Sequence, residues 1–169
     1  MSSEIVSVIA DIALTLSLIV AIVFGIAQVR TAKVDRRERL TLGALRNFQS
    51  KEFAEMILLT MVDKFPQNYQ QWLEWPKAER VLFIQLIQEM ESLGILLGDG
   101  LIDIDLLDKT LGSFIVTTWE KLKPALTAMR EKNNDPYLSE YFQWMAEQID
   151  RRMKEKPRKP FFQSAGPIV

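Results

Sequence analysis

The chain contains neither cysteine nor histidine. Without cysteine there are no disulfide bonds, zinc–thiolate sites, iron–sulfur clusters or cysteine nucleophiles. Without histidine the chain lacks the commonest metal ligand, the usual general base near neutral pH and the Glu-x-x-His pairs of di-iron helical bundles. We therefore expect no catalytic residues, no metal site and no cofactor, and we expect that the protein is not an enzyme.

Sequence motifs that bind nucleotides or cations are also missing. No Gly-x-x-x-x-Gly-Lys loop and no dinucleotide fingerprint occurs. Residues 98–105 are the most metal-like string, but an EF-hand register with Gly100 at its sixth position puts apolar residues where calcium needs oxygen. We interpret this string as a helix stop followed by an N-cap at Asp103. Carboxylate pairs such as Asp105 with Asp108 are interpreted as a solvated helix face.

Basic residues are absent from the first 29 positions, which hold two acidic side chains. Residues 30–39 hold five bases and two acids, residues 40–150 hold ten bases and 17 acids, and residues 151–159 hold six bases and one acid. A segment as acidic as residues 40–150 is poorly suited to bind the phosphate backbone of nucleic acids, so we expect no nucleic-acid partner. Basic segments close to a membrane attract anionic headgroups, at roughly 1 kcal/mol per Lys or Arg.

Residues 1–29 are predicted to contain a transmembrane anchor. The 18 residues from Ile12 to Val29 carry no charge, which is long enough for a helix to cross most of a hydrocarbon core. A secretory signal would begin with a basic region, which is missing here. An uncleaved single-pass anchor in the inner membrane is therefore favoured over a signal peptide or a buried core helix. A basic group predicts that the N-terminus lies outside and the body in the cytoplasm: Arg30, Lys33, Arg36, Arg37 and Arg39.

The anchor carries two series of residues spaced four apart. The polar series is Ser3, Ser7, Asp11 and Thr15, with Asp11 expected near the outer interface. Small residues let transmembrane helices approach closely. The small series and Asp11 are therefore predicted to contact membrane partners or a second copy, although small residues are common in any anchor. The small series, called the small-residue stripe below, is Ala13, Ser17, Ala21 and Gly25.

The remainder of the chain predicts an all-α fold, because no segment alternates with the period of a strand over a useful length. Residues 30–49 are expected to continue the anchor helix or to form a short helix on the membrane surface. Residues 50–153 are expected to form a cytoplasmic bundle of about five helices. Residues 154–169 are expected to form a flexible basic tail with prolines, in which Phe161 and Phe162 contact a membrane or a partner, or nothing.

Local signals predict where the helices of the bundle begin and end. Ser50 is a plausible N-cap for a helix that stops near Phe65-Pro66, and a central helix should run from Pro76 to Gly98. We expect Asp103 to cap a short helix that Gly112-Ser113 interrupts. The next helix should kink or restart at Pro124 and end at Asn133-Asn134. Asp135-Pro136 should begin the last helix.

Four tryptophans are expected to have two different roles. Trp119 and Trp144 fall within apolar periods and are predicted to lie in the core. Trp72 and Trp75 fall in the polar segment 66–76, predicted to be a loop. We expect these two to contact the membrane surface or a partner, because aromatic side chains anchor interfaces.

The segment from Gly94 to Met145 resembles a known family. The similarity lies in Gly100-Leu101-Ile102-Asp103, Gly112-Ser113-Phe114-Ile115-Val116, Trp119-Glu120-Lys121-Leu122-Lys123-Pro124, Arg130, Asp135-Pro136-Tyr137 and Phe142. These residues resemble a bacterial family of small single-pass membrane proteins, one of the domains of unknown function. The resemblance implies an N-terminal anchor, a basic juxtamembrane stretch and a cytoplasmic helical body, but no activity. Arg130 is expected to bind exposed carbonyls or an acid such as Glu120.

From the sequence we expect a non-enzymatic accessory or scaffold subunit that covers the cytoplasmic face of a larger inner-membrane complex. Its partners would be membrane lipids and integral membrane proteins, or a second copy of itself. The alternative is a homo-oligomeric membrane sensor or effector whose body binds a ligand or signal. A third class is a membrane-bound serine–lysine hydrolase, but no pair of residues in the sequence indicates one.

Overall fold

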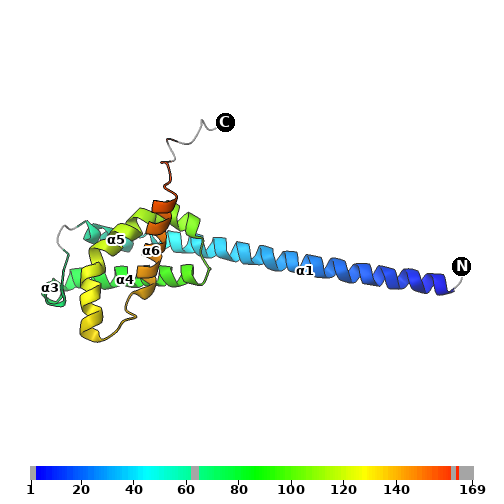
Figure 1. Ribbon diagram of the computed structural model, residues 1–169, viewed down its shortest axis with the longest axis horizontal. Coiled ribbons are helices and arrows are strands. Elements are labelled where there is room, and N and C mark those ends of the chain that lie inside the picture. The colour runs from blue at the N-terminus through cyan, green and yellow to red at the C-terminus, as the bar shows by residue number, and fades with distance from the viewer. Residues whose placement is uncertain (1–2, 62–64, 161–162, 164–169) are drawn as a thin grey trace. The chain divides into compact units, whose positions relative to one another are not determined.

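The computed structural model describes residues 3–61, 65–160 and 163, and all the regular structure in these residues is helical (Figure 1). The helices are α1 (Ser3–Asn47), α2 (Lys51–Thr60), α3 (Tyr69–Glu74), α4 (Lys77–Gly98), α5 (Ile104–Asn133) and α6 (Glu140–Glu155). The prediction of an all-α chain with about five helices after the N-terminal helix is confirmed. Phe161 and Phe162 lie outside the described residues.

The chain divides into two compact units, Met1–Arg39 and Leu40–Val169, and α1 contributes to both. In the second unit Leu40, Ala44 and Phe48 pack against the core, and the Thr41 hydroxyl accepts a hydrogen bond from the Asp103 amide at 3.1 Å. Of the two alternatives for residues 30–49, the structure shows the continuation of the N-terminal helix, here as far as Asn47.

By length and composition, α1 and α4 could each cross a membrane. The two helices differ in burial. In α4 the side chains of Phe83, Leu86 and Met90 are fully buried in the core, whereas the large apolar side chains described between Ile5 and Val29 are each 51–69% exposed. The N-terminal part of α1 therefore has the length and the apolar surface of a membrane span or a signal sequence.

The segment 66–76 was predicted to be a loop, but it contains α3. Asn68 is the N-cap, and its side chain accepts a hydrogen bond from the Gln71 amide at 2.9 Å. The prediction overlooked this cap because a six-residue polar helix shows no apolar period. The preceding helix, α2, has the predicted N-cap Ser50 but ends at Thr60, earlier than Phe65-Pro66.

Helix α4 ends where the sequence predicted. Gly100 adopts a left-handed conformation with φ +67°, and the Leu101 amide donates to the Leu96 carbonyl at 2.9 Å. This arrangement satisfies carbonyls that the helix end leaves free, and glycine adopts it without steric cost. One face of α4 is buried in the core, with Leu86, Met90 and Leu93 at most 3% exposed.

Helix α5 begins at the predicted N-cap Asp103 but runs without interruption to Asn133. The predicted break at Gly112-Ser113 is wrong, because α5 continues through both residues. A Cβ atom at Gly112 would lie 2.5 Å from the Asp108 Oδ1 atom and 2.8 Å from the Met153 Cε atom. The glycine therefore permits close packing inside a continuous helix. A restart at Pro124 is also wrong, although Figure 1 shows the ribbon of α5 bending along its length.

The last helix, α6, begins at Glu140 and not at the predicted Asp135-Pro136. The Asp135 side chain accepts a hydrogen bond from the Tyr137 amide at 3.1 Å, so it stabilises a local turn. The N-terminus of α6 is capped from another helix. Both carboxylate oxygens of Glu91 in α4 accept backbone N–H groups, from Tyr141 at 3.3 Å and from Phe142 at 2.8 Å.

Helices α4, α5 and α6 share one apolar core. Phe142, Met145 and Ile149 of α6 are fully buried. Trp119 of α5 is 2% exposed and meets the ring of Phe142 edge-on with centroids 5.3 Å apart. Trp144 is 38% exposed, so its predicted core position is wrong.

Candidate functional site

The small-residue stripe lies on the exposed surface of α1. Ala13, Ser17, Ala21 and Gly25 are all exposed, and successive members are about 40° apart around the helix axis. A Cβ atom placed on Gly25 would meet nothing within 4 Å. The stripe therefore covers an arc of about 120° on which the backbone of another helix can approach closely.

Asp11 is also exposed. Its backbone carbonyl accepts a hydrogen bond from the Thr15 hydroxyl at 2.8 Å. This bond satisfies the Thr15 hydroxyl within the helix, and it leaves the Asp11 carboxylate out of the contact. The exposed carboxylate can therefore face water or a partner.

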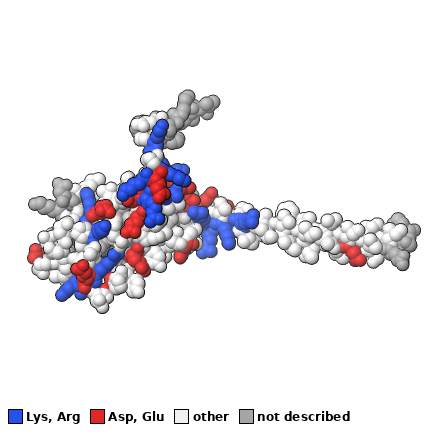
Figure 2. Space-filling view, viewed as in Figure 1, with Lys and Arg blue, Asp and Glu red and all other residues white. Residues whose placement is uncertain are grey.

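The predicted basic segment forms the exposed surface of α1 directly after the uncharged stretch. Figure 2 shows Lys and Arg side chains gathered on the helix beside a long region without charge. The five basic residues, Arg30, Lys33, Arg36, Arg37 and Arg39, are all exposed. Their side chains are placed for electrostatic contact with anionic headgroups if the uncharged stretch lies in a bilayer.

Trp72 and Trp75 are half-buried in the helical body. The Trp75 ring lies between those of Phe65 and Phe83, with centroid distances of 5.4 and 6.1 Å. The Arg80 guanidinium lies 5.5 Å from the centre of the Trp72 ring. These contacts pack α3 against the core, so each tryptophan has only part of its surface left for a membrane or a partner.

Arg130 has the role that the sequence suggested as one of two alternatives. Its guanidinium donates hydrogen bonds to the Leu138 carbonyl at 2.8 Å, the Ser139 carbonyl at 3.2 Å and the Gln143 side chain at 2.6 Å. It also lies 5.8 Å from the centre of the Trp119 ring. It therefore binds exposed carbonyls, and its contacts hold the turn between α5 and α6.

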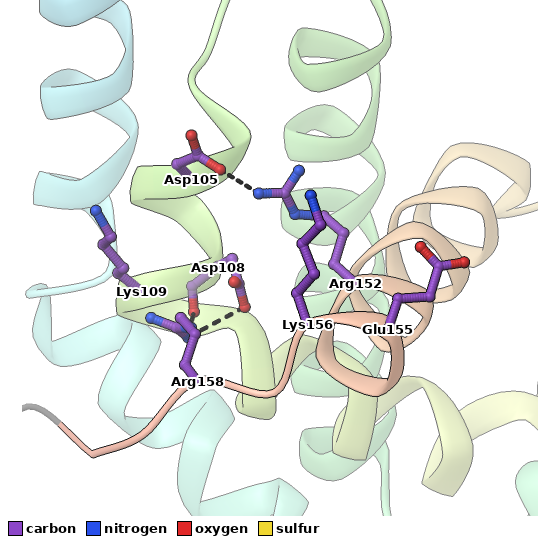
Figure 3. Close-up of a pocket in the computed structure, with 7 residues that line it drawn as sticks. All are labelled: Asp105, Asp108, Lys109, Arg152, Glu155, Lys156 and Arg158. Atoms are coloured by element: carbon purple, nitrogen blue, oxygen red, sulfur yellow. Dashed lines mark hydrogen bonds and ion pairs between the residues drawn. The ribbon is translucent and has the colours of Figure 1, made fainter.

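A charged pocket of about 230 Å³ lies between the first turns of α5 and the end of α6 (Figure 3). The segment after α6 completes it, because the Arg158 guanidinium donates to the Asp108 carbonyl at 2.8 Å and to the Asp108 carboxylate at 3.2 Å. Arg152 of α6 pairs with Asp105 of α5. The residues lining the pocket are Asp105, Asp108, Lys109, Arg152, Glu155, Lys156 and Arg158.

Sequence reasoning missed this pocket because it treated its two halves separately. Asp105 and Asp108 were interpreted as a solvated pair, but Asp108 is only 7% exposed. Residues 154–169 were expected to be a flexible tail, although α6 continues to Glu155 and Arg158 contacts α5. The signal that could have found it is the combination of an acidic pair at the start of α5 with the basic run 151–159.

Among the described residues, no group of three or more acidic side chains is arranged to hold a metal ion. The family whose description reads domain of unknown function (DUF4760) matches residues 7–149. No curated protein and no solved structure matches the chain. The family match begins in the apolar part of α1 and ends within α6, so it covers most of both units and stops before Arg152. The chain therefore belongs to the DUF4760 family of domains of unknown function.

Proposed function

We propose that this chain is a single-pass protein of a bacterial inner membrane, with its N-terminus outside and its helical body in the cytoplasm. The observation that carries the proposal is the N-terminal part of α1, where every large apolar side chain described between Ile5 and Val29 is at least half exposed. Exposure of this apolar surface to water is unfavourable, and the hydrocarbon core of a bilayer would cover it. The basic group from Arg30 to Arg39 follows directly and supports the orientation.

Within the membrane, the protein acts as an accessory or scaffold subunit. The small-residue stripe supports this role, because it gives another transmembrane helix a place to pack closely. The helical body would then be held at the cytoplasmic face of the same complex. The alternative is a homo-oligomer in which the stripe packs against a second copy.

The chain is expected to stay in the membrane pellet when bacterial membranes are washed with alkaline carbonate. In the double variant Leu18→Arg and Ile22→Arg, two charges at the centre of the span would raise the insertion free energy by roughly 5 kcal/mol or more, moving the protein to the supernatant. The control is Leu58→Arg, which changes a leucine that is 63% exposed in α2 and should stay in the pellet. Recovery of the unchanged chain in the supernatant would overturn the membrane assignment.

Orientation is tested with protease and sealed vesicles. In right-side-out vesicles the body should be protected, and in inverted vesicles it should be digested. Digestion of the body in intact right-side-out vesicles would show the opposite orientation.

Substitution of Gly25 by isoleucine is expected to reduce the recovery of membrane partners in a mild-detergent pull-down at least about fivefold, because a branched side chain prevents close helix packing. The matched control is Ala27→Ile, which lies about 160° around α1 from Gly25 and should recover the same partners. Equal recovery with both variants would show that the stripe is not the interface. If cross-linking identifies the partner as a second copy, the homo-oligomer is supported in place of the accessory subunit.

A further inference from the structure

The charged pocket between α5 and α6 brings four cationic side chains together from three parts of the chain (Figure 3). Lys109 comes from α5, Arg152 from α6, and Lys156 and Arg158 from the end of α6 and the segment that follows. Ordinary repulsion between like charges opposes such a cluster unless anionic groups offset it. Three carboxylates of the protein do so only in part, which leaves the lining with one more positive than negative charge.

Two of the carboxylates hold the arginines in place. Asp108 is 7% exposed, and both its carboxylate and its backbone carbonyl accept from a single terminal nitrogen of Arg158. Asp105 likewise accepts from one terminal nitrogen of Arg152. A guanidinium has five N–H donors in a fixed fork, so each arginine keeps donors that these contacts do not use.

The two lysines contribute charge without a fixed partner. Neither the Lys109 side chain nor the Lys156 side chain makes a hydrogen bond or an ion pair with any described residue. Both side chains are exposed at the pocket, and each ammonium group has three donors. The pocket therefore combines two arginines that are already oriented with two lysines whose charge is unpaired.

We propose that this pocket binds a phosphate group presented as a phosphomonoester. Such a group carries up to about two negative charges and three strong acceptor oxygens, which suits a site of guanidinium and ammonium donors. The volume of about 230 Å³ holds the group with room for water, since one water takes about 30 Å³ in the liquid. This site is independent of what the anchor binds.

The test is a calorimetric titration of the full chain, purified in neutral detergent, with inorganic phosphate at constant ionic strength. Saturable binding is expected with a dissociation constant of about 1 mM or below. The double variant Lys109→Gln and Lys156→Gln should weaken it at least about tenfold, because two charge-assisted contacts are lost. Neither lysine side chain has a partner among the residues that the structure describes, so the variant should melt at the temperature of the unchanged chain.

The matched control is Lys77→Gln with Lys123→Gln, which removes the same charge from two exposed positions of α4 and α5 outside the pocket. Its affinity should stay within about twofold of the unchanged chain. Absence of saturable binding up to about 10 mM phosphate would overturn the proposal. Equal weakening in both double variants would overturn it as well, because the effect would then come from overall charge.

The source of the phosphate group is distinguished by a second titration in mixed micelles. If phosphatidic acid displaces inorganic phosphate and phosphatidylcholine does not, the ligand is a lipid headgroup. If neither lipid displaces it, the ligand is a soluble phosphate compound. Either outcome supports the pocket, provided that the lysine variants weaken the binding.

Discussion

Replacing Gly94 by alanine is expected to lower the free energy of unfolding of the helical body by about 2 kcal/mol, within the range measured for overpacked cores. A Cβ atom at this position of α4 would lie 2.5 Å from the carbonyl oxygen of Tyr141 and 2.6 Å from its carbonyl carbon. Both are backbone atoms, so no rotation of a side chain can relieve the clash. Helices α4 and α6 would have to move apart at the point where Glu91 caps α6.

The opposing effect is helix propensity, because alanine is favoured over glycine inside a helix by about 1 kcal/mol. Gly98→Ala is the matched control, since it lies one turn further along α4 and its added Cβ would sit 3.7 Å from the Tyr141 ring, an ordinary contact. This variant should be as stable as the unchanged chain or more so. Thermal unfolding of the full chain in mild detergent, followed by tryptophan fluorescence, measures both. A Gly94→Ala variant as stable as Gly98→Ala would contradict the close crossing.

Cap residues and glycines show why some helix ends could be predicted from the sequence and others could not. Ser50, Asp103 and Gly100 were predicted correctly because a cap or a positive φ is a local property of a few residues. The close approaches at Gly94 and Gly112 involve residues far along the chain, Tyr141 and Met153. Nothing in the neighbouring sequence separates a glycine that ends a helix from one that lets two helices approach.

The absence of a restart at Pro124 and of a helix start at Asp135-Pro136 has a related reason. Proline inside a helix costs about 3 kcal/mol, and a sequence-based expectation treats that cost as decisive. Here Leu122 and Leu126 on either side of Pro124 are fully buried, and their packing keeps α5 intact. The N-terminus of α6 begins where Glu91 of α4 can cap it, and this carboxylate is about 50 residues away in the chain.

The candidate sites divide in the same way. The small-residue stripe and the basic group on α1 depend on spacing within one helix, so both could be located from the sequence. The charged pocket depends on the contact between Asp108 and Arg158, which are 50 residues apart in the sequence. That Asp108 is only 7% exposed is therefore information that only the folded structure supplies.

Replacing Arg130 by methionine is expected to destabilise the body by about 2 kcal/mol, because a hydrogen bond to a charged donor is worth more than a neutral one and several are lost together. The Leu138 and Ser139 carbonyls would lose their donor in the turn between α5 and α6. Methionine keeps a long apolar side chain over the Trp119 ring, so the loss reports the hydrogen bonds more than the packing.

A lysine at position 130 separates charge from geometry. Its ammonium group keeps the positive charge beside Trp119 but cannot reproduce the planar fork that reaches Leu138, Ser139 and Gln143 at once. Arg130→Lys should therefore unfold nearly as easily as Arg130→Met in the same thermal measurement. The control Arg151→Met, at an exposed position of α6, should change the stability by less than about 0.5 kcal/mol. If Arg130→Lys is as stable as the unchanged chain, the charge over Trp119 holds the turn, and the hydrogen bonds to its carbonyls do not.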